Sequence, residues 1–354
     1  MAPPRSRVFL DWNAGAPLRP EARDAMIAAL DLVGNPSSVH AEGREARALV
    51  ERARAQVAAL IGCDVGSVVF TSGATEAAAL AAASLPPLSG GAVEHDCVAA
   101  HLSTILPVDA GGAVQTDEAG GALALQAANS ETGIVQPDPG RFVDLVDAVQ
   151  ILGRRPWRFE PDRMRFALVS AHKLGGPKGV GALIVAPGSR LAAHAPGGGQ
   201  EMGRRAGTEN LAGIAGFGAA AEAAGRDLAA GVWARTEKLR IILENTLEAG
   251  APEVILVGRN ADRLANTACF AVPGWKGETQ VMQMDLAGFA VSAGSACSSG
   301  KVRESRVLRA TGFDDATAGG AIRVSLGPAT TEADVRAFCD AWLTHYRRRE
   351  ARAA

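Results

Sequence analysis

The sequence predicts an α/β fold, with one large domain on a mainly parallel sheet and a smaller α+β domain. Its 354 residues exceed what a single hydrophobic core usually organises, so two domains are expected. Apolar residues make up 47% of the chain, which is ample for two cores. Short apolar runs alternate with longer alanine-rich stretches, as strands alternate with helices in an α/β sheet.

The large domain is expected to begin with two helices, at residues 19–32 and 44–61. Between them the turn-rich segment GNPSSVH, at residues 34–40, interrupts the helical pattern. Short apolar runs then predict strands at residues 67–71, 122–127, 142–146, 165–169 and 181–185. Residues 210–247 are alanine-rich with few helix breakers, which predicts long helices leading out of this domain.

The small domain is expected from about residue 250 onward. Strands are predicted at residues 254–257, 269–272 and 322–326, with helical stretches between them. This alternation is typical of a small α+β domain.

Composition excludes several classes of function. The formal net charge is −2, from 36 basic and 38 acidic residues, which gives little support for binding nucleic acid or a membrane surface. No apolar run is long enough for a secretion leader or a membrane span. The five cysteines are widely spread and include no CxxC pair, which argues against a disulfide framework or a structural zinc site. We therefore expect a cytoplasmic protein in a reducing compartment.

The segment TSGATE, at residues 71–76, ends an apolar run and begins a helix-prone stretch. Backbone N–H groups at a helix start, aided by a hydroxyl such as that of Thr75, bind phosphate well. A simple helix cap is the alternative interpretation of this segment. No Walker lysine follows, so a nucleoside triphosphatase loop is not supported.

Two further polar residues follow predicted strands. Lys173 lies in SAHKLGGPKG, where a partly desolvated lysine can form a Schiff base with an aldehyde. A surface lysine in a turn is the alternative, and it is the interpretation that we favour for Lys178. Asp147 could keep a pyridinium nitrogen protonated, although a lone aspartate at a strand end is usually a cap. Phosphate loop, lysine and aspartate together indicate pyridoxal 5'-phosphate.

Cys297 lies within SAGSACSSG, at residues 292–300. Small, flexible residues surround it, whereas a structural cysteine normally has larger apolar neighbours. The setting indicates a thiol that is reachable and able to move. A plain thiol in a tolerant turn is the alternative.

Taken together, the motifs resemble the cysteine desulfurases of the class V aminotransferase group, which are fold-type I pyridoxal-phosphate enzymes. The resemblance covers nearly the whole chain and is most specific in the combination of SAHK, GGGQE, GTEN and SACSSG. Other matching segments are LDWNAGAP, GNPSSVHAEGREAR, VVFTSGATEA, VEH, AANSETGIVQP, VDAVQ and AIRVSLG. The resemblance implies a large cofactor-binding domain at residues 13–235. A small domain, from residues 1–12 and 236–354, would carry the Cys297 loop.

The resemblance also implies roles for single residues. Lys173 would hold the cofactor covalently, Asp147 would pair with its pyridine nitrogen, and His95 would stack on its ring and relay protons. Gln150 would bond the phenolic oxygen. Further cofactor contacts would come from Ala74, Thr75, Asn129, Ser170, His172 and, from the other subunit of a homodimer, Thr208.

On the substrate side, Asn129 and Arg323 would clamp the carboxylate of L-cysteine, and Cys297 would be the nucleophile. The implied products are L-alanine and a persulfide on Cys297, whose sulfur passes to an acceptor protein for iron–sulfur cluster, thio-cofactor or thiolated tRNA biosynthesis. A selenocysteine lyase, or another class V lyase or transaminase, is the alternative with the same cofactor. A catalytically weakened partner or regulatory module is the alternative of another class, disfavoured because Lys173, Asp147, Arg323 and Cys297 occur together.

One connection is shorter than the family pattern. Only residues 134–145, with two prolines, separate NSETG from VDAVQ, where the family generally has a helix. We therefore expect an extended loop there and a less covered sheet face.

Overall fold

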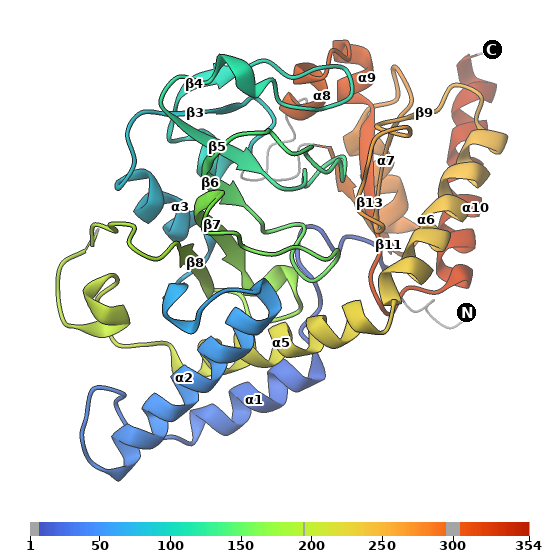
Figure 1. Cartoon of the computed structure of the whole chain (residues 1–354). Helices are drawn as coiled ribbons and strands as arrows, with labels where there is room; N and C mark the ends of the chain where they lie inside the picture. Colours follow the sequence, from blue (N-terminus) through green and yellow to red (C-terminus); the bar gives the residue numbers. More distant parts are fainter. Residues whose placement is uncertain (1–6, 194, 295–304, 354) are drawn as a thin grey trace.

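The computed structural model describes residues 7–193, 195–294 and 305–353. Its largest sheet has seven strands in the order β2-β8-β7-β6-β5-β3-β4 (Figure 1). Neighbours from β4 to β7 pair in parallel, and β8 is antiparallel to both β7 and β2. The strands are β2 (Val68–Thr71), β3 (Leu88–Gly91), β4 (Leu102–Leu106), β5 (Ala122–Gln126), β6 (Val143–Asp147), β7 (Met164–Ser170) and β8 (Gly181–Val185).

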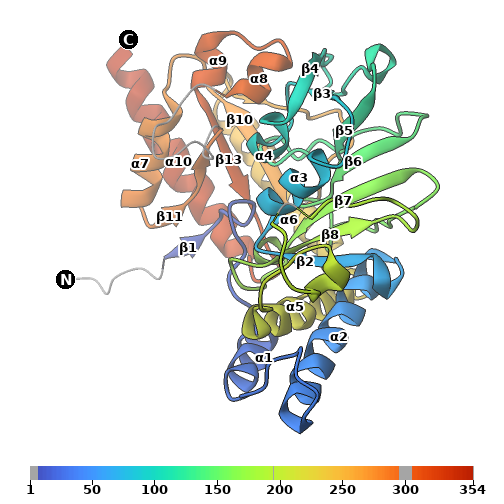
Figure 2. The same ribbon diagram turned by 90° about the vertical axis from the view of Figure 1, so that its left-hand side faces the viewer.

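Helices cover both faces of this sheet, as its continuous apolar strands require (Figure 2). Phe166 and Leu168 of β7 face the core that includes α3, whereas Ala167 and Val169 face the core of α1, α2 and α5. The helices are α1 (Pro20–Leu30), α2 (Ala41–Ile61), α3 (Ala74–Ala82), α4 (Asp96–Ala99) and α5 (Leu211–Ala229). Short 3-10 turns are η1 (Val65–Ser67), η2 (Thr116–Glu118), η3 (Ala171–Lys173) and η4 (Gln200–Gly203).

A second core surrounds a four-stranded antiparallel sheet in the order β12-β13-β10-β9. A two-stranded parallel sheet, β1 (Val8–Phe9) with β11 (Phe289–Ala290), adjoins this core. The other strands are β9 (Ile255–Leu256), β10 (Thr267–Ala271), β12 (Ser292–Ala293) and β13 (Ala321–Ser325). The helices are α6 (Val232–Gly250), α7 (Gly277–Leu286), α8 (Arg306–Ala310), α9 (Asp315–Gly319) and α10 (Glu332–Ala353).

Most predicted strands and helices are present within a few residues of their expected bounds. Five strands are missing from the prediction, namely β1, β3, β4, β11 and β12. Three of these have only two residues, too few for an apolar pattern. The sequence of β3 is LSGG, and its two glycines give no apolar pattern from which this buried strand could be predicted.

The short connection between β5 and β6 is confirmed as a loop. Residues 127–142, all of which the structure describes, contain no helix. A hollow of about 510 Å³ lies there, lined by residues of the sheet face such as Leu125, Val143 and Val146 and by Trp157. Leu125, Val143 and Val146 are nevertheless only 5–6% exposed, so the expectation of a less covered sheet face stays a prediction.

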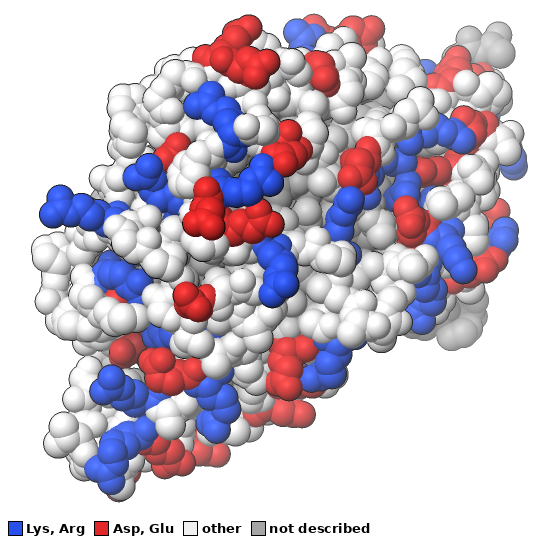
Figure 3. Space-filling view, in the orientation of Figure 1, with Lys and Arg blue, Asp and Glu red and all other residues white. Residues whose placement is uncertain are grey.

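The surface charges and the helices are consistent with what the sequence predicts about nucleic acid and membrane binding. Basic and acidic side chains are interspersed over the face drawn in Figure 3. None of the helices in the described part of the chain combines the length and apolar content needed to cross a bilayer.

A buried ion pair holds the loop that follows β8. Glu201 and Met202 have φ angles of 50° and 58°, in the left-handed region that residues other than glycine seldom adopt. The carboxylate of Glu201 accepts hydrogen bonds from Arg54 Nη1 and Nη2 at 2.6 and 2.8 Å, and from the Phe70 N–H at 2.9 Å. Both charged side chains are buried. The pair therefore ties a strained segment to α2 and β2.

We predict that Glu201→Ala lowers the free energy of unfolding by about 3–5 kcal/mol, because Arg54 is left buried without its carboxylate. Urea denaturation followed by circular dichroism measures this loss. Glu248→Ala is the matched control, since Glu248 pairs with Arg259 on the surface, and its midpoint should stay close to that of the unsubstituted protein. Equal midpoints for the two variants would show that other contacts hold the loop.

Candidate active site

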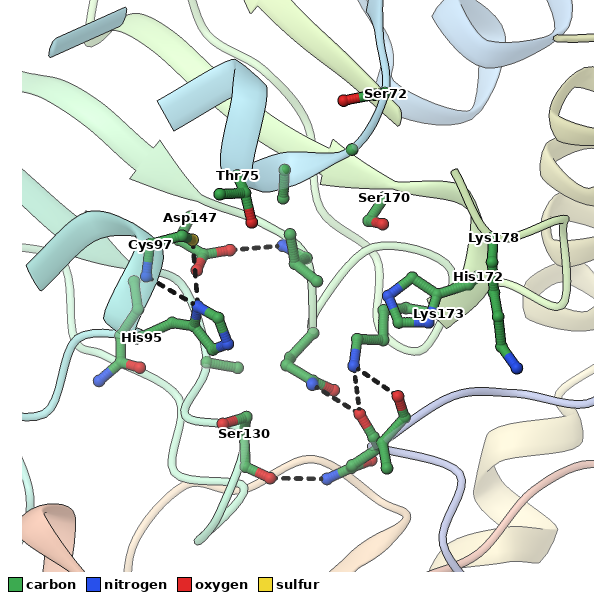
Figure 4. A pocket seen from close by; sticks show the side chains of 18 of the residues that line it. Ser72, Thr75, His95, Cys97, Ser130, Asp147, Ser170, His172, Lys173 and Lys178 are labelled. Atoms are coloured by element: carbon green, nitrogen blue, oxygen red, sulfur yellow. Dashed lines mark hydrogen bonds between the residues drawn. The ribbon is translucent and has the colours of Figure 1, made fainter. Parts of the chain in front are cut away.

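A cavity of about 400 Å³ lies where β5, β6 and β7 end and α3 begins. Such a crevice at the carboxyl ends of strands is where open α/β sheets bind ligands. In Figure 4, His95 and Asp147 lie on the opposite side of this cavity from Ser170, His172 and Lys173. The structure brings nine of the predicted site residues into its lining: Ala74, Thr75, His95, Asp147, Gln150, Ser170, His172, Lys173 and Arg323.

One end of the cavity is suited to a phosphate. The first turn of α3 contributes Ala74 and Thr75, and a Cβ added to Gly181 of β8 would lie 2.8 Å from the Cα of Gly73, so helix and sheet approach closely. Ser170 and His172 border the same cavity. Burial and the nearby charges of lysine and arginine side chains lower the pKa of His172 to about 4, which keeps this ring neutral at pH 7.

Asp147 ends β6 and is only 8% exposed. One of its carboxylate oxygens accepts a hydrogen bond from the Val149 N–H at 3.0 Å. Burial raises the pKa of Asp147, and the charges of His95 and Lys173 oppose that shift. A cationic ring N–H beside this carboxylate would compensate the burial of its charge.

His95 is held by the residue two positions later, Cys97. The Cys97 backbone N–H donates to His95 Nδ1 at 3.2 Å, and Cys97 Sγ lies 3.0 Å from the same nitrogen. Because Nδ1 accepts the Cys97 N–H, a neutral His95 ring carries its proton on Nε2.

Lys173 reaches across to the N-terminal segment. Its Nζ donates to the carbonyl oxygens of Asn13 and Ala14 at 2.7 and 3.0 Å. Gln150 Nε2 donates to the same Asn13 oxygen at 3.2 Å. The backbone at Asn13 therefore positions both side chains.

Asn13 is itself 1% exposed, and its carboxamide is fully used. Its Nδ2 donates to the Ser130 oxygen at 3.1 Å and to Thr267 Oγ1 at 2.9 Å. Its Oδ1 accepts from Arg154 Nη1 at 2.7 Å and from Asn266 Nδ2 at 3.0 Å. This single side chain thus connects the cavity wall to the four-stranded sheet.

Arg323 projects from β13 of the four-stranded sheet into the cavity lining. Its Nη2 donates to Asp11 Oδ1 at 2.8 Å and its Nη1 to the Ser130 oxygen at 3.0 Å. Each terminal nitrogen carries a second N–H, so the fixed guanidinium keeps donors for a carboxylate. Its Nε is buried and has no hydrogen-bond partner among the described residues.

The family model of aminotransferase class-V matches residues 8–338 of the chain. The chain belongs to this family. It is 39% identical to a cysteine desulfurase of Frankia sp. (strain EuIK1), over 94% of this chain and 90% of that protein. It is 40% identical to a cysteine desulfurase of Cereibacter sphaeroides, over 93% of each chain.

Two solved structures are similar to this chain in fold. A NifS-like protein from Rickettsia africae ESF-5 superposes with a TM-score of 0.88 at 29% identity, covering 96% of this chain and 99% of that one. A structure titled SspA in complex with cysteine has a TM-score of 0.76 at 26% identity, covering 92% and 100% of the two chains. The family resemblance and the α/β fold-type I class predicted from the sequence are therefore confirmed.

Class-V aminotransferases use pyridoxal phosphate, and the cavity fits its three reactive parts. The first turn of α3, with Thr75, suits the phosphate, the buried Asp147 carboxylate suits the ring nitrogen, and the Lys173 amine suits the aldehyde. Each of these assignments remains a proposal about the residue concerned.

Three predicted site residues are not among those that line the cavity. Asn129 Nδ2 donates to the Val93 oxygen and to Gln126 Oε1, and Asn129 Oδ1 accepts from residues 131 and 132. Gln126 lines the cavity instead. Thr208 lines an adjacent hollow of about 260 Å³, and Cys297 lies outside the described residues. The roles of Asn129, Thr208 and Cys297 stay predictions.

Four residues at the site are not predicted from the sequence, namely Asn13, Gln126, Cys97 and Arg154. Arg154 follows Gln150 by four residues, which is a spacing that brings side chains together in a helical turn. Asn13 lies within the segment LDWNAGAP and Cys97 lies two residues after VEH, but neither motif indicates their hydrogen-bond partners.

Glu94 immediately precedes His95 and is 1% exposed. Its Oε1 accepts from the Gln126 N–H at 2.8 Å, and its Oε2 has no hydrogen-bond partner among the described residues. Burial raises the pKa of Glu94 from 4.5 to about 8. The folded protein therefore binds a proton here that the unfolded chain releases.

We predict that Glu94→Gln makes stability less dependent on pH between about 5 and 8. In this window the folded state holds more protons than the unfolded state, so Glu94 makes stability fall as pH rises, by up to about 1.4 kcal/mol per pH unit. Urea denaturation at pH 5.5, 6.5 and 7.5 measures the slope. The exposed control Glu160→Gln should keep the original slope, and an unchanged slope in Glu94→Gln would contradict the prediction.

Proposed function

We propose that the chain is a pyridoxal-phosphate-dependent cysteine desulfurase, which converts L-cysteine to L-alanine and places the sulfur on Cys297 as a persulfide. The observation that carries this proposal is the meeting of Lys173, Asp147 and Arg323 at one cavity. Identity of 39% and 40% to two cysteine desulfurases over most of the chain supports it.

When bound, pyridoxal phosphate supplies an electron sink for charge that develops at the substrate α-carbon. Arg323 binds the substrate carboxylate, and Asp11 keeps the guanidinium in place. Lys173 accepts and returns the α-proton at Nζ. His95 acts as a proton donor at Nε2, because its Nδ1 accepts the Cys97 N–H and so cannot carry the proton of a neutral ring.

The thiolate of Cys297 attacks the substrate sulfur. The sulfur–sulfur bond forms as the sulfur–carbon bond breaks, and the electron pair left on carbon is protonated to give alanine. The persulfide sulfur then passes to an acceptor protein. Because this chemistry needs a reduced thiol, a cytoplasmic location is part of the proposal.

A homodimer is the assembly that we propose. Thr208 is exposed, and its hollow shares Ser72 and Gly179 with the main cavity, so a neighbouring subunit can approach the phosphate end there. The tip that joins α1 to α2, which projects at the lower left of Figure 1, exposes apolar side chains as an interaction surface would. The exposed apolar residues are Ile27 and Leu30 at the end of α1, and Val33 and Val39 in the connection to α2.

We predict that Cys297→Ala abolishes sulfide release from L-cysteine, by at least about 100-fold, because it removes the thiol that we propose takes the sulfur. The visible absorbance of the bound cofactor should remain. Sulfide and alanine are quantified together, and Cys63→Ala, which removes a half-buried thiol away from the cavity, is the matched control. A loaded protein that releases alanine or pyruvate without sulfur transfer would instead favour a lyase or transaminase.

We predict a mass in solution of about twice the 36.3 kDa of one chain, measured by light scattering. Thr208→Ala should keep this mass and weaken cofactor binding several-fold, since it removes one hydroxyl contact. Thr344→Ala, an exposed threonine on α10, serves as control. A monomeric protein with full cofactor affinity would exclude a ligand donated between subunits.

A further inference from the structure

Arg154 is a buried cation whose hydrogen-bond acceptors are all neutral oxygens. It is 4% exposed and follows β6. Its Nη1 donates to Asn13 Oδ1 at 2.7 Å and to Gln150 Oε1, and its Nη2 donates to the Trp12 and Lys173 oxygens at 3.4 and 3.5 Å. No described carboxylate pairs with this guanidinium, in contrast to the buried Arg54.

A buried charge without a counter-charge is costly. Burial and the charge of Arg323 lower the pKa of Arg154 to about 9. The charge of Arg154 also acts on the cavity itself, because it helps to lower the pKa of His172. An anionic group bound in the cavity would supply the compensation that the described residues lack.

The contact with Gln150 fixes the direction of a carboxamide. A guanidinium has donors only, so the end of Gln150 that faces Arg154 must be Oε1. Nε2 therefore points the other way, to the Asn13 oxygen that Lys173 Nζ also contacts. Gln150 can then offer only N–H donors to a group bound beside Lys173.

We propose that Arg154 is a positioning residue that acts through Gln150, locking its Nε2 toward the cavity so that the amide donates to the deprotonated ring hydroxyl of bound pyridoxal phosphate. The guanidinium adds the positive charge that balances this oxygen. The inference rests on the proposed function only in requiring this cofactor.

The two effects act in the same direction on the bound cofactor. A nearby positive charge and a donor to the ring oxygen both favour loss of the proton that the cofactor shares with Lys173. Removing Arg154 takes away the charge and lets the carboxamide rotate. The pH midpoint at which the visible absorbance band changes should therefore rise.

The experiment follows this band from pH 5 to 10 in the loaded protein. Arg154→Met should raise the midpoint by about one pH unit or more, a tenfold change in proton affinity. Arg154→Lys, which keeps the charge but not the planar fork, should give a smaller rise. Arg155→Met is the matched control, because Arg155 is exposed and pairs with Asp262 at the surface.

A double substitution separates positioning from bulk charge. If Arg154 acts through Gln150, the rise caused by Arg154→Lys disappears when Gln150 is already alanine. A rise of the same size in the Gln150→Ala background overturns the proposed route. The lysine variants also carry the test if Arg154→Met does not fold.

The remaining outcomes distinguish this inference from the proposed function. A band whose midpoint is the same in the unsubstituted protein, Arg154→Lys and Arg154→Met overturns the inference alone. No cofactor band in the unsubstituted protein overturns both. Sulfur release is not needed for either conclusion.

Discussion

Asn13 is the residue that joins the two parts of the site, the cavity wall with Lys173 and the four-stranded sheet with Arg323. Its backbone oxygen accepts from Lys173 and Gln150, and its carboxamide bonds Asn266 and Thr267 of the other sheet. The reaction needs Lys173 and Arg323 at one substrate, yet Lys173 follows β7 of the seven-stranded sheet and Arg323 lies on β13 of the four-stranded sheet. Asn13 connects them through Ser130, whose oxygen accepts from both Asn13 Nδ2 and Arg323 Nη1, and the low exposure of Asn13 keeps water from competing for these bonds.

Among the described residues, some buried charges away from the cavity are paired, whereas two at the cavity are not. Glu201 with Arg54, and Glu244 with Arg240 and Arg263, form buried pairs. At the cavity, by contrast, Asp147 and Arg154 are buried without an opposite charge in direct contact. Natural proteins leave buried charges unpaired mainly at their functional sites. The departures here are of opposite sign, as a ligand with both a cationic ring nitrogen and an anionic oxygen requires.

The sequence predicts those parts of the site that follow a strand directly. Asp147 and Lys173 each follow an apolar run, so their place at the sheet edge can be read without a structure. The contact between Asn13 and Arg154 cannot be found this way, because the two residues are 141 positions apart in the sequence. The hydrogen bond from Asn129 to Gln126 depends on side-chain packing, which no sequence pattern predicts. The predicted domain boundaries stay predictions.

The pairing of β1 with β11 has a consequence for how the chain is made. The N–H of Leu10 bonds the oxygen of Ala290, and that of Trp12 bonds Ser325, so the first strand completes its contacts with segments from the last quarter of the chain. During synthesis this segment leaves the ribosome well before the segments with which it pairs. Contacts of such long sequence separation form late in folding. A nascent chain therefore has no finished lysine pocket in which to bind the cofactor until the segments around Ala290 and Ser325 have been translated.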